Sequence, residues 1–508
     1  MPPASGDWLS FDIEPVLSLG YDAPFTVTLA LPDGRLLSRP VAPVGFDRQP
    51  RARFVWVWDT TGLSGSQSFT VTLFVPPDVR DTGLADNVLT LEVPLQDRTA
   101  LPPPEPGARW DLQSAAGIRL HYVTGSAAER DAAMLLALAQ GAYADVAARL
   151  GVTTTEALDI YALDRVVGQG GYATSDWVAI SYTDRAYAPA EMTLLLRHEL
   201  THRLDSAWEC DTLPVLFREG LAVWVAGGHY WPESLPRKTA GLLQTGRYIP
   251  LEQLLGDFYR QQHEIGYLEA GALVAYIVEE RGLEGVQQLC GAFAAAQGDE
   301  PARLAAGLTA VDLPAMPQLE QEWLRWLRSL HISAEELRIL EGEWLLMDSM
   351  RLYQQLHDPS ANFLTGILFD PAAAVERGIT ADLVRRPRDP EAVALELLLQ
   401  MTQEALRAGD SEEAAYTLEA LRVALHDGTS AAPEVVIRMR ALVEAVMARG
   451  YEPYRTICFE DAVAVGQRAP GCVVYALDRS NWPTKRLLWA ARGADLDSWT
   501  VVGPQLEN

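Results

Sequence analysis

The chain of 508 residues lacks the features that would place it in a membrane or on a polyanion. It has no stretch of 18 uninterrupted apolar residues, so we expect no transmembrane helix. Basic residues are few: 41 Lys and Arg stand against 68 Asp and Glu, a formal net charge of −27. That charge opposes long-range attraction to nucleic acid or anionic membranes. Residues 1–7 lack a basic region followed by an apolar run, so we expect no secretory signal, and either a cytoplasmic protein or a trimmed chain.

Cysteine is also scarce. The four cysteines are Cys210, Cys290, Cys458 and Cys472, and no two of them form a CxxC pair. A structural zinc site made of cysteines is therefore not expected. Cys458 and Cys472 flank a predicted β-hairpin and could form a disulfide, although two free core thiols fit equally well. The cysteines leave the redox compartment open.

The hydrophobic and charged contents, 48% and 21%, are those of an ordinary globular protein, but the chain is too long for one core. We predict a multidomain α+β protein that begins with a β-sandwich over residues 1–98. Strands are expected at Phe25–Ala30, Phe54–Trp58, Phe69–Val75 and Val88–Val93, at the spacing of a sandwich. The segment that ends in the last of these resembles the final strand of an immunoglobulin-like adhesion module. The resemblance implies an extracellular or cell-surface protein.

A proline-rich stretch over residues 101–107 predicts a stiff linker, and we expect protease to cut between residues 97 and 109. The next unit, residues 109–330, begins with strands and turns helical from about residue 189. Strands are predicted at Ile118–Val123, Ala157–Leu163 and Trp177–Tyr182, with a helix between the first two that starts at Ser126 and ends at Gly151. The strand Trp177–Tyr182 is a candidate sheet edge for an extended peptide.

The last third of the chain carries no chemical motif that we can assign. Residues 331–450 predict a helical domain, and residues 451–508 predict a small β-rich cap with alternating runs at Cys472–Leu477 and Leu487–Ala491. No fixed-period repeat is evident.

Histidine is rare as well, with eight in the chain, yet two stand four residues apart in His198-Glu199-Leu200-Thr201-His202. Residues four apart lie on one side of an α-helix, so His198 and His202 can bind one metal ion. Glu199 lies about 100° around the helix, close enough to accept a proton from a metal-bound water. The alternative is a polar turn on an amphipathic helix, and the residues that follow argue against it.

A catalytic zinc with two histidines needs a third protein ligand and one open position. Asp205 lies three residues after His202, but three ligands from one straight helix would strain tetrahedral geometry. Glu219 is better placed, because Pro214 starts a second helix and Glu219 falls in its first turns, where it can face the first helix.

The stretch Glu219-Gly220-Leu221-Ala222 matches an E-G-x-A signature, and with it the sequence resembles the gluzincin metallopeptidases, in particular bacterial peptidase MA-like domains. The likeness continues through residues 248–254, 266–276 and 321–323, and so covers residues 109–330. It implies a two-lobed zincin-like domain with one Zn²⁺ per chain, bound by His198, His202 and Glu219. Glu199 would be the general base.

Tyr267 is the candidate for support of the oxyanion, because the matching helix carries a tyrosine in related enzymes. Tyr276 on the same predicted helix is the alternative, and either residue could simply be a core tyrosine. His229 and His263 lack a partner at ligand spacing, and we expect both on a loop or at the surface.

Two departures from the family matter for the substrate. Only 16 residues separate His202 from Glu219, fewer than in aminopeptidase-N-like enzymes. Those enzymes also hold the substrate's α-amine with a glutamate in a G-x-M-E-N motif, whereas the corresponding stretch here, residues 170–177, has no glutamate. Gly170, Gly171 and Tyr172 at its start are the candidate substrate-binding residues. Cleavage within a chain is therefore favoured over removal of an N-terminal residue.

The first hypothesis is a zinc-dependent metallopeptidase that acts on a peptide or protein substrate. The second is a non-catalytic binding or scaffold protein that retains a zincin fold beside an adhesion-type module; the intact Glu199 argues against it. A third keeps the metal but cleaves a non-peptide amide. The sequence leaves the specificity and the oligomeric state open.

Overall fold

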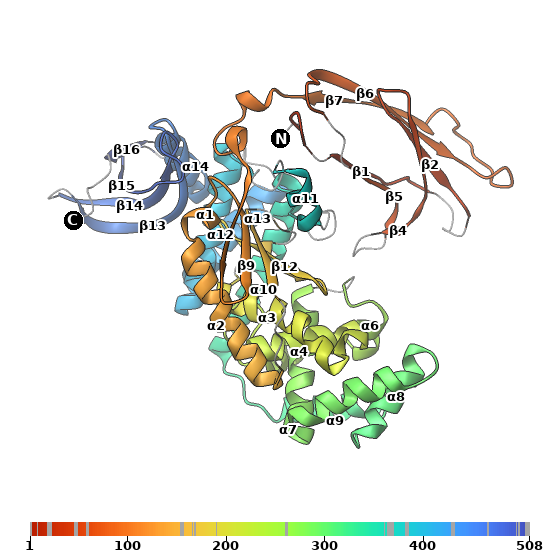
Figure 1. The fold of residues 1–508 in the computed structure, drawn as a ribbon. Helices are drawn as coiled ribbons and strands as arrows, with labels where there is room; N and C mark the ends of the chain where they lie inside the picture. Colours follow the sequence, from red (N-terminus) through yellow and green to blue (C-terminus); the bar gives the residue numbers. More distant parts are fainter. Residues whose placement is uncertain are drawn as a thin grey trace.

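The computed structural model describes residues 3–7, 9–17, 23–44, 49–56, 60–152, 157–164, 166, 169–188, 190–259, 263–359, 361–362, 370–380, 386–427, 432–464, 467–493, 495 and 498–502. Over these residues the protein is a mixed α+β structure with sheets in its N-terminal part and mainly helices after it (Figure 1).

The N-terminal region consists of two antiparallel sheets that share one apolar core. One sheet has the order β1 (Leu9–Ile13), β5 (Gln49–Trp56), β4 (Ala42–Val44); the other has the order β3 (Leu36–Pro40), β2 (Thr26–Ala30), β6 (Gly65–Phe74), β7 (Val88–Leu95). Phe11, Phe54 and Phe69 are buried between them, together with the inward-facing residues of β2. All four predicted strands are present, although residues 57–59 lie outside the described part.

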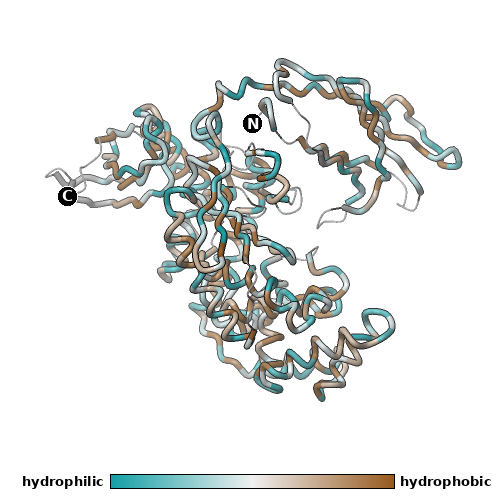
Figure 2. The backbone as a smooth tube through the Cα atoms, viewed as in Figure 1, coloured by the Kyte–Doolittle hydropathy of each residue, from teal (hydrophilic) through white to brown (hydrophobic). Residues whose placement is uncertain are grey.

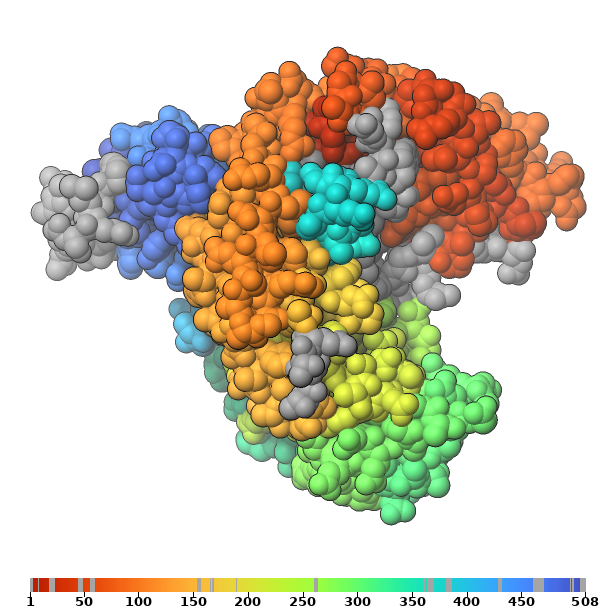
Figure 3. All heavy atoms as spheres, viewed as in Figure 1, coloured from red at the N-terminus to blue at the C-terminus, as the bar shows by residue number. Residues whose placement is uncertain are grey.

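The predicted linker packs against residues that are far away in the sequence. Arg98 donates a hydrogen bond to Thr380 Oγ1 at 2.7 Å, and Arg388 donates one to the carbonyl oxygen of Pro103 at 2.9 Å. Trp110 Nε1 donates to the carbonyl oxygen of Ile379 at 2.7 Å. The linker is therefore docked on the segment around residue 380 rather than free, which argues against the easy proteolysis expected from its composition (Figures 1 and 3).

The central sheet has five strands in the order β11 (Gly171–Ala173), β12 (Trp177–Ser181), β10 (Leu158–Leu163), β9 (Ile118–Val123), β8 (Trp110–Ala115). β9, β10 and β12 are parallel, and the two outer strands are antiparallel to their neighbours. The expectation that residues 177–182 form the sheet edge is wrong, because β11 folds back through a turn and covers that side. β8, which no sequence signal predicted, forms the opposite edge.

Helices cover both faces of this sheet. One face packs against α2 (Ala132–Leu150) and α3 (Met192–Leu204), with Ile160 and Val178 buried between them. α2 ends where predicted, since Gly151 is left-handed with φ 63°. Its predicted start is broken at Asp131, which separates it from a single turn, α1 (Ala127–Arg130). The other face packs against α11 (Pro371–Arg377).

The helical region follows the sheet and extends its core (Figure 1). Its helices are α4 (Val215–Ala226), α5 (Leu235–Gln244), α6 (Leu251–Gly256), α7 (His263–Ala295, kinked at Gly282), α8 (Glu300–Ala310) and α9 (Met316–Arg328). Trp323 on α9 is fully buried in this core.

The C-terminal helices and the C-terminal sheet share a second core. The helices are α10 (Ala334–His357), α12 (Pro390–Ala408), α13 (Ser411–Asp427) and α14 (Glu434–Met447); the antiparallel sheet is β13 (Tyr451–Ala464), β14 (Gln467–Asp478), β15 (Lys485–Arg492), β16 (Trp499–Val502). Tyr187 and Ala188 from the loop after β12 belong to the same core. α10 joins it to the first core, since Trp344 packs in the first and Met347 in the second. Packing therefore continues across the boundaries predicted at residues 330 and 450.

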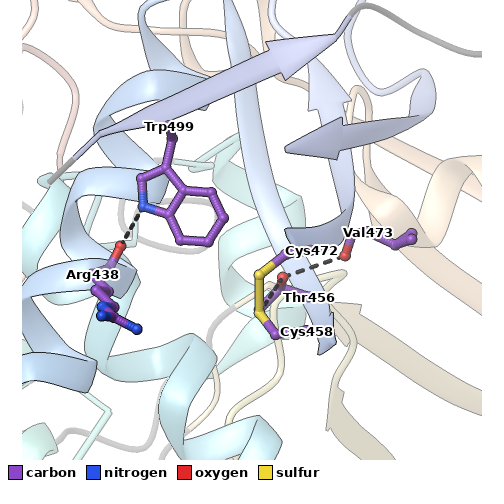
Figure 4. The surroundings of a disulfide bond; sticks show 6 residues. All are labelled: Arg438, Thr456, Cys458, Cys472, Val473 and Trp499. Atoms are coloured by element: carbon purple, nitrogen blue, oxygen red, sulfur yellow. Dashed lines mark hydrogen bonds between the residues drawn. A yellow bond between two sulfur atoms is a disulfide. The ribbon is translucent and has the colours of Figure 1, made fainter. Parts of the chain in front are cut away.

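All four cysteines are paired. Cys458 and Cys472 face each other on β13 and β14, beside Thr456, and Trp499 on β16 donates a hydrogen bond to the carbonyl oxygen of Arg438 on α14 (Figure 4). The second pair, Cys210 with Cys290, joins residues 80 apart in sequence and is fully buried. The alternative of two free thiols at Cys458 and Cys472 is therefore wrong.

Hydrophobic and hydrophilic segments alternate along the chain (Figure 2). Within the described residues, none of the helices combines the length and apolarity needed to span a bilayer.

Candidate metal centre

The first ligand-bearing element is α3, whose start is fixed by its own sequence. Glu191 caps the helix and accepts hydrogen bonds from the backbone N–H groups of Thr193 and Leu194 at 3.1 and 2.8 Å. Four leucines of α3 pack in the core beside the sheet: Leu195, Leu196, Leu200 and Leu204. His198 and His202, one turn apart, lie together on another side of the helix.

The second element is α4, which presents Glu219 to α3. Close contact between α4 and α7 sets its position, and two glycines permit that contact. A Cβ at Gly220 would lie 2.5 Å from the carbonyl oxygen of Ala270 on α7, and one at Gly271 would lie 2.6 Å from Val223 Cγ1 on α4. The glycine after Glu219 in the E-G-x-A stretch therefore has a packing reason in this fold.

Three side chains from these two helices converge on one point. His202 Nε2 lies 3.2 Å from His198 Nε2 and 3.2 Å from Glu219 Oε2, and His198 Nε2 lies 3.3 Å from the same oxygen. Tetrahedral zinc with bonds near 2.0–2.1 Å needs ligand atoms about 3.3 Å apart. The three atoms thus form one face of a suitable tetrahedron. In the described part of the chain, this is the one group of three or more His, Cys, Asp or Glu side chains able to hold a metal ion.

The chemistry of the donor set also fits a metal ion. Although burial favours its protonated form, the neighbouring His202 and His198 hold the pKa of Glu219 well below its usual value. Two imidazole nitrogens and one carboxylate oxygen suit zinc. Of the two acids that competed for the third position, the structure brings Glu219 to the histidines; Asp205 is not part of the group.

Glu199 lies beside this group, buried against the edge strand β11. Burial raises the pKa of Glu199 to about 7, against the opposing effect of His198, and Glu219 adds to the rise. A Cβ at Gly171 would lie 2.9 Å from Glu199 Oε1 and 2.9 Å from the carbonyl oxygen of Ala179 on β12. Only a glycine lets β11 run this close to the carboxylate.

The three predicted substrate-binding residues are placed differently. Gly171 borders Glu199, as described. The carbonyl oxygen of Gly170 accepts a hydrogen bond from the backbone N–H of Ser181 at 2.8 Å, so it continues the pairing with β12. Tyr172 packs on the other face of the sheet, with its ring 5.3 Å from that of Trp177. The ring of Tyr172 is thus directed away from the helices that carry the metal group.

Tyr267 lies in the first turns of α7, next to the metal group. Its ring centroid is 5.9 Å from that of His198 and 5.2 Å from that of Phe258. Burial, followed by the Glu219 carboxylate, raises the pKa of Tyr267 well above its usual value, so the hydroxyl keeps its proton. Tyr276 packs against Trp326 on α9. The fold thus brings Tyr267, and not Tyr276, to His198.

Two further residues reach the site that the sequence did not assign to it. Tyr259, in the loop before α7, donates a hydrogen bond from its hydroxyl to Glu219 Oε1 at 2.7 Å. His229, expected on a loop or at the surface, lies in the loop after α4, where its ring stacks on Tyr267 at 4.3 Å with an angle of 4° between the planes. Neither residue stands at a ligand spacing, so no local signal could have found them. His263 begins α7, and its side chain lies outside the described part.

Comparisons with protein-family models, with curated proteins and with solved structures find no match for this chain.

Proposed function

We propose that the protein is a zinc-dependent metallopeptidase with a gluzincin-type, two-lobed catalytic domain. The observation that carries the proposal is the triangle of His198, His202 and Glu219, with Glu199 buried beside it. Donor identity and spacing match those of a catalytic zinc site that keeps one position open. A zinc ion bound there would supply Lewis acidity towards the scissile carbonyl and the attacking water.

The remaining steps belong to residues of the chain. Glu199 accepts the proton of the attacking water and passes it to the leaving amine. Tyr267 donates a hydrogen bond to the carbonyl oxygen as negative charge develops there. Glu219 is oriented by the hydroxyl of Tyr259.

The edge strand β11 is the proposed docking site for the substrate backbone. It ends the sheet order and passes next to Glu199, so a peptide that adds to its outer side would bring a peptide bond close to the metal group. The stretch 170–177 has no glutamate to hold a substrate's α-amine. Both points favour an endopeptidase over an aminopeptidase.

The two disulfides support an oxidising compartment. Cys210 and Cys290 are fully buried, and their bond ties the segment between α3 and α4 to α7. Disulfides of this structural kind form and persist mainly outside the reducing cytosol. Together with the sandwich-like N-terminal region, they favour an extracellular or cell-surface location.

The test is cleavage of a casein-type substrate by the purified full chain, with and without a chelator, alongside elemental analysis for one zinc per chain. Glu199→Gln should retain zinc and lose at least about 10²–10⁴ in turnover, because the ligands remain while the general base is gone. Glu269→Gln is the matched control, since Glu269 is a buried glutamate that accepts from the backbone N–H of Ile249 at 2.9 Å. If His198→Ala, His202→Ala and Glu219→Ala retain zinc, or if Glu199→Gln keeps full activity, the proposal is rejected and the binding-protein alternative is favoured.

A further inference from the structure

Asp205 occupies the position one turn after the second metal-binding histidine. It is the first residue after α3 and begins the short 3₁₀ helix η4 (Asp205–Trp208). Its backbone N–H still donates to the carbonyl oxygen of Thr201, so the helical geometry continues to this residue. Residues three apart on a helix have Cβ atoms about 5–6 Å apart on one face, which places Asp205 beside His202.

The carboxylate of Asp205 is an anomaly in the core. The residue is 1% exposed, and both of its carboxylate oxygens are buried without a hydrogen-bond partner. No other carboxylate in the described residues has both oxygens in this condition. A buried, unpaired carboxylate is costly, so its presence calls for an explanation.

His202 has a matching unsatisfied atom. Its Nε2 faces His198 and Glu219, so its Nδ1 lies on the opposite side of the ring, where it is buried without a partner. A metal-binding imidazole carries its proton on the other ring nitrogen and almost always donates it to a carboxylate, a carbonyl or a water. Among the charged groups that act on the Asp205 carboxylate, His202 is the one with the largest effect.

Arg218 is the other cation near Asp205, and it offers a purely structural alternative. The two side chains, both in the described part, form neither an ion pair nor a hydrogen bond, and Arg218 Nε is itself buried without a partner. An interaction with Arg218 therefore does not explain the buried carboxylate of Asp205.

We propose that Asp205 is the positioning residue of His202: its carboxylate accepts the Nδ1 proton, directly or through one water, and keeps Nε2 directed at a divalent metal ion. The inference rests on the proposed metal site and deepens it.

The test compares Asp205→Ala, Asp205→Asn and the control Asp164→Asn in the full chain. Asp164 is another buried acid, with one oxygen unpartnered, and it lies after β10 away from the metal group. Zinc affinity is measured by competition with a chromophoric chelator, and thermal unfolding is measured on the metal-free proteins at about pH 8, where an ordinary carboxyl is ionised. We expect Asp205→Ala to weaken zinc binding by about 10–100-fold and the shape-preserving Asp205→Asn by less.

The metal-free protein should respond in the opposite direction. Asp205→Asn removes a buried charge that lacks hydrogen bonds, so its Tm should rise while its zinc affinity falls; Asp164→Asn should leave zinc affinity unchanged. Zinc affinity equal to wild type in both Asp205 variants would overturn the inference. A fall in the Tm of metal-free Asp205→Asn would instead assign a structural role. If the wild-type protein does not bind zinc, the metal site itself is rejected. That result differs from failure of the Asp205 inference alone, in which the wild type and both Asp205 variants bind zinc equally.

Discussion

Two buried polar clusters differ in how fully their atoms are paired. In the Arg185 cluster (Arg185, Glu396 and Glu452), Arg185 donates to both carboxylates, with 2.7 Å from Nη1 to Glu452 Oε1, and Tyr353 donates to Glu396 at 2.6 Å. No side-chain atom of these three residues is buried without a partner. The metal group, by contrast, leaves the Nδ1 atoms of His198 and His202 unpaired.

The difference separates a cluster of ion pairs from a group that could hold a metal ion. The Arg185 cluster joins the loop after β12 to α12 and β13. Arg185 forms ion pairs with both carboxylates, and Arg386 forms a second ion pair with Glu452 at 3.3 Å. Three donor atoms of the metal group are instead directed at a common point. The contact between the Nε2 atoms of His198 and His202 brings two like groups together and provides little stabilisation by itself. The convergence of three donor atoms on one point therefore distinguishes the metal group from the Arg185 cluster.

The largest expected effect comes from breaking the Arg185 cluster. Arg185→Met leaves the buried Glu396 without its cation and removes one of the cations at Glu452, so the free energy of unfolding should fall by about 3–5 kcal/mol, measured by urea denaturation. Zinc binding by the folded protein should not change. Arg119→Met, which removes the half-exposed pair with Asp159, is the control and should cost less than about 1 kcal/mol. Equal effects would mean that the buried cluster is no more important than a surface pair.

Tyr267→Phe should lower the turnover number and leave the free energy of unfolding almost unchanged. We expect kcat to fall by about 10²–10³ with little change in KM, because the hydroxyl acts mainly in the transition state. Tyr276→Phe is the control on the same helix, since Tyr276 contacts Trp326. A loss confined to Tyr276→Phe would show that the assignment of the two tyrosines is reversed.

Tyr259→Phe should weaken zinc binding by about tenfold or somewhat more, because Glu219 loses the hydrogen bond that orients it. Tyr248→Phe provides a matched control: it also removes a tyrosine hydroxyl that donates to a glutamate, Glu320, outside the metal group. Competition with a chromophoric chelator measures both variants. Similar affinities for the two variants would remove Tyr259 from the metal centre.

The effect expected at Asp164 depends on pH. Burial raises the pKa of Asp164 to about 7 in the folded protein, from the usual value of 3.8. The Asp164 carboxyl therefore binds its proton more tightly in the folded state than in the unfolded state. The free energy of unfolding should fall as the pH rises from about 4 to about 7. Asp164→Asn should raise Tm by a few degrees at about pH 8 and leave it unchanged at about pH 4. An increase of the same size at both pH values would show that the charge of Asp164 is not the cause.

Local periodicity is enough to predict several elements and part of the site. The strand Ile118–Val123 and the helix end at Gly151 appear where alternation and the glycine signal placed them. His198 and His202 lie together because their separation matches one helical turn, which needs no tertiary contact. The edge of the sheet was misplaced, because β11 is only three residues long and carries no alternation to reveal it.

The sequence by itself determined which residues could share a helix face, and so proposed both histidines, Glu199 and two competing acids. Only the tertiary structure brought Glu219, and not Asp205, into the group with both histidines, and Tyr267, and not Tyr276, next to His198. Those choices depend on how closely α4 approaches α7, which Gly220 and Gly271 permit. Tyr259 and His229 enter the site from loops, and Cys210 pairs with Cys290 across 80 residues. Such contacts follow from packing between distant segments, and helix or strand periodicity does not encode them.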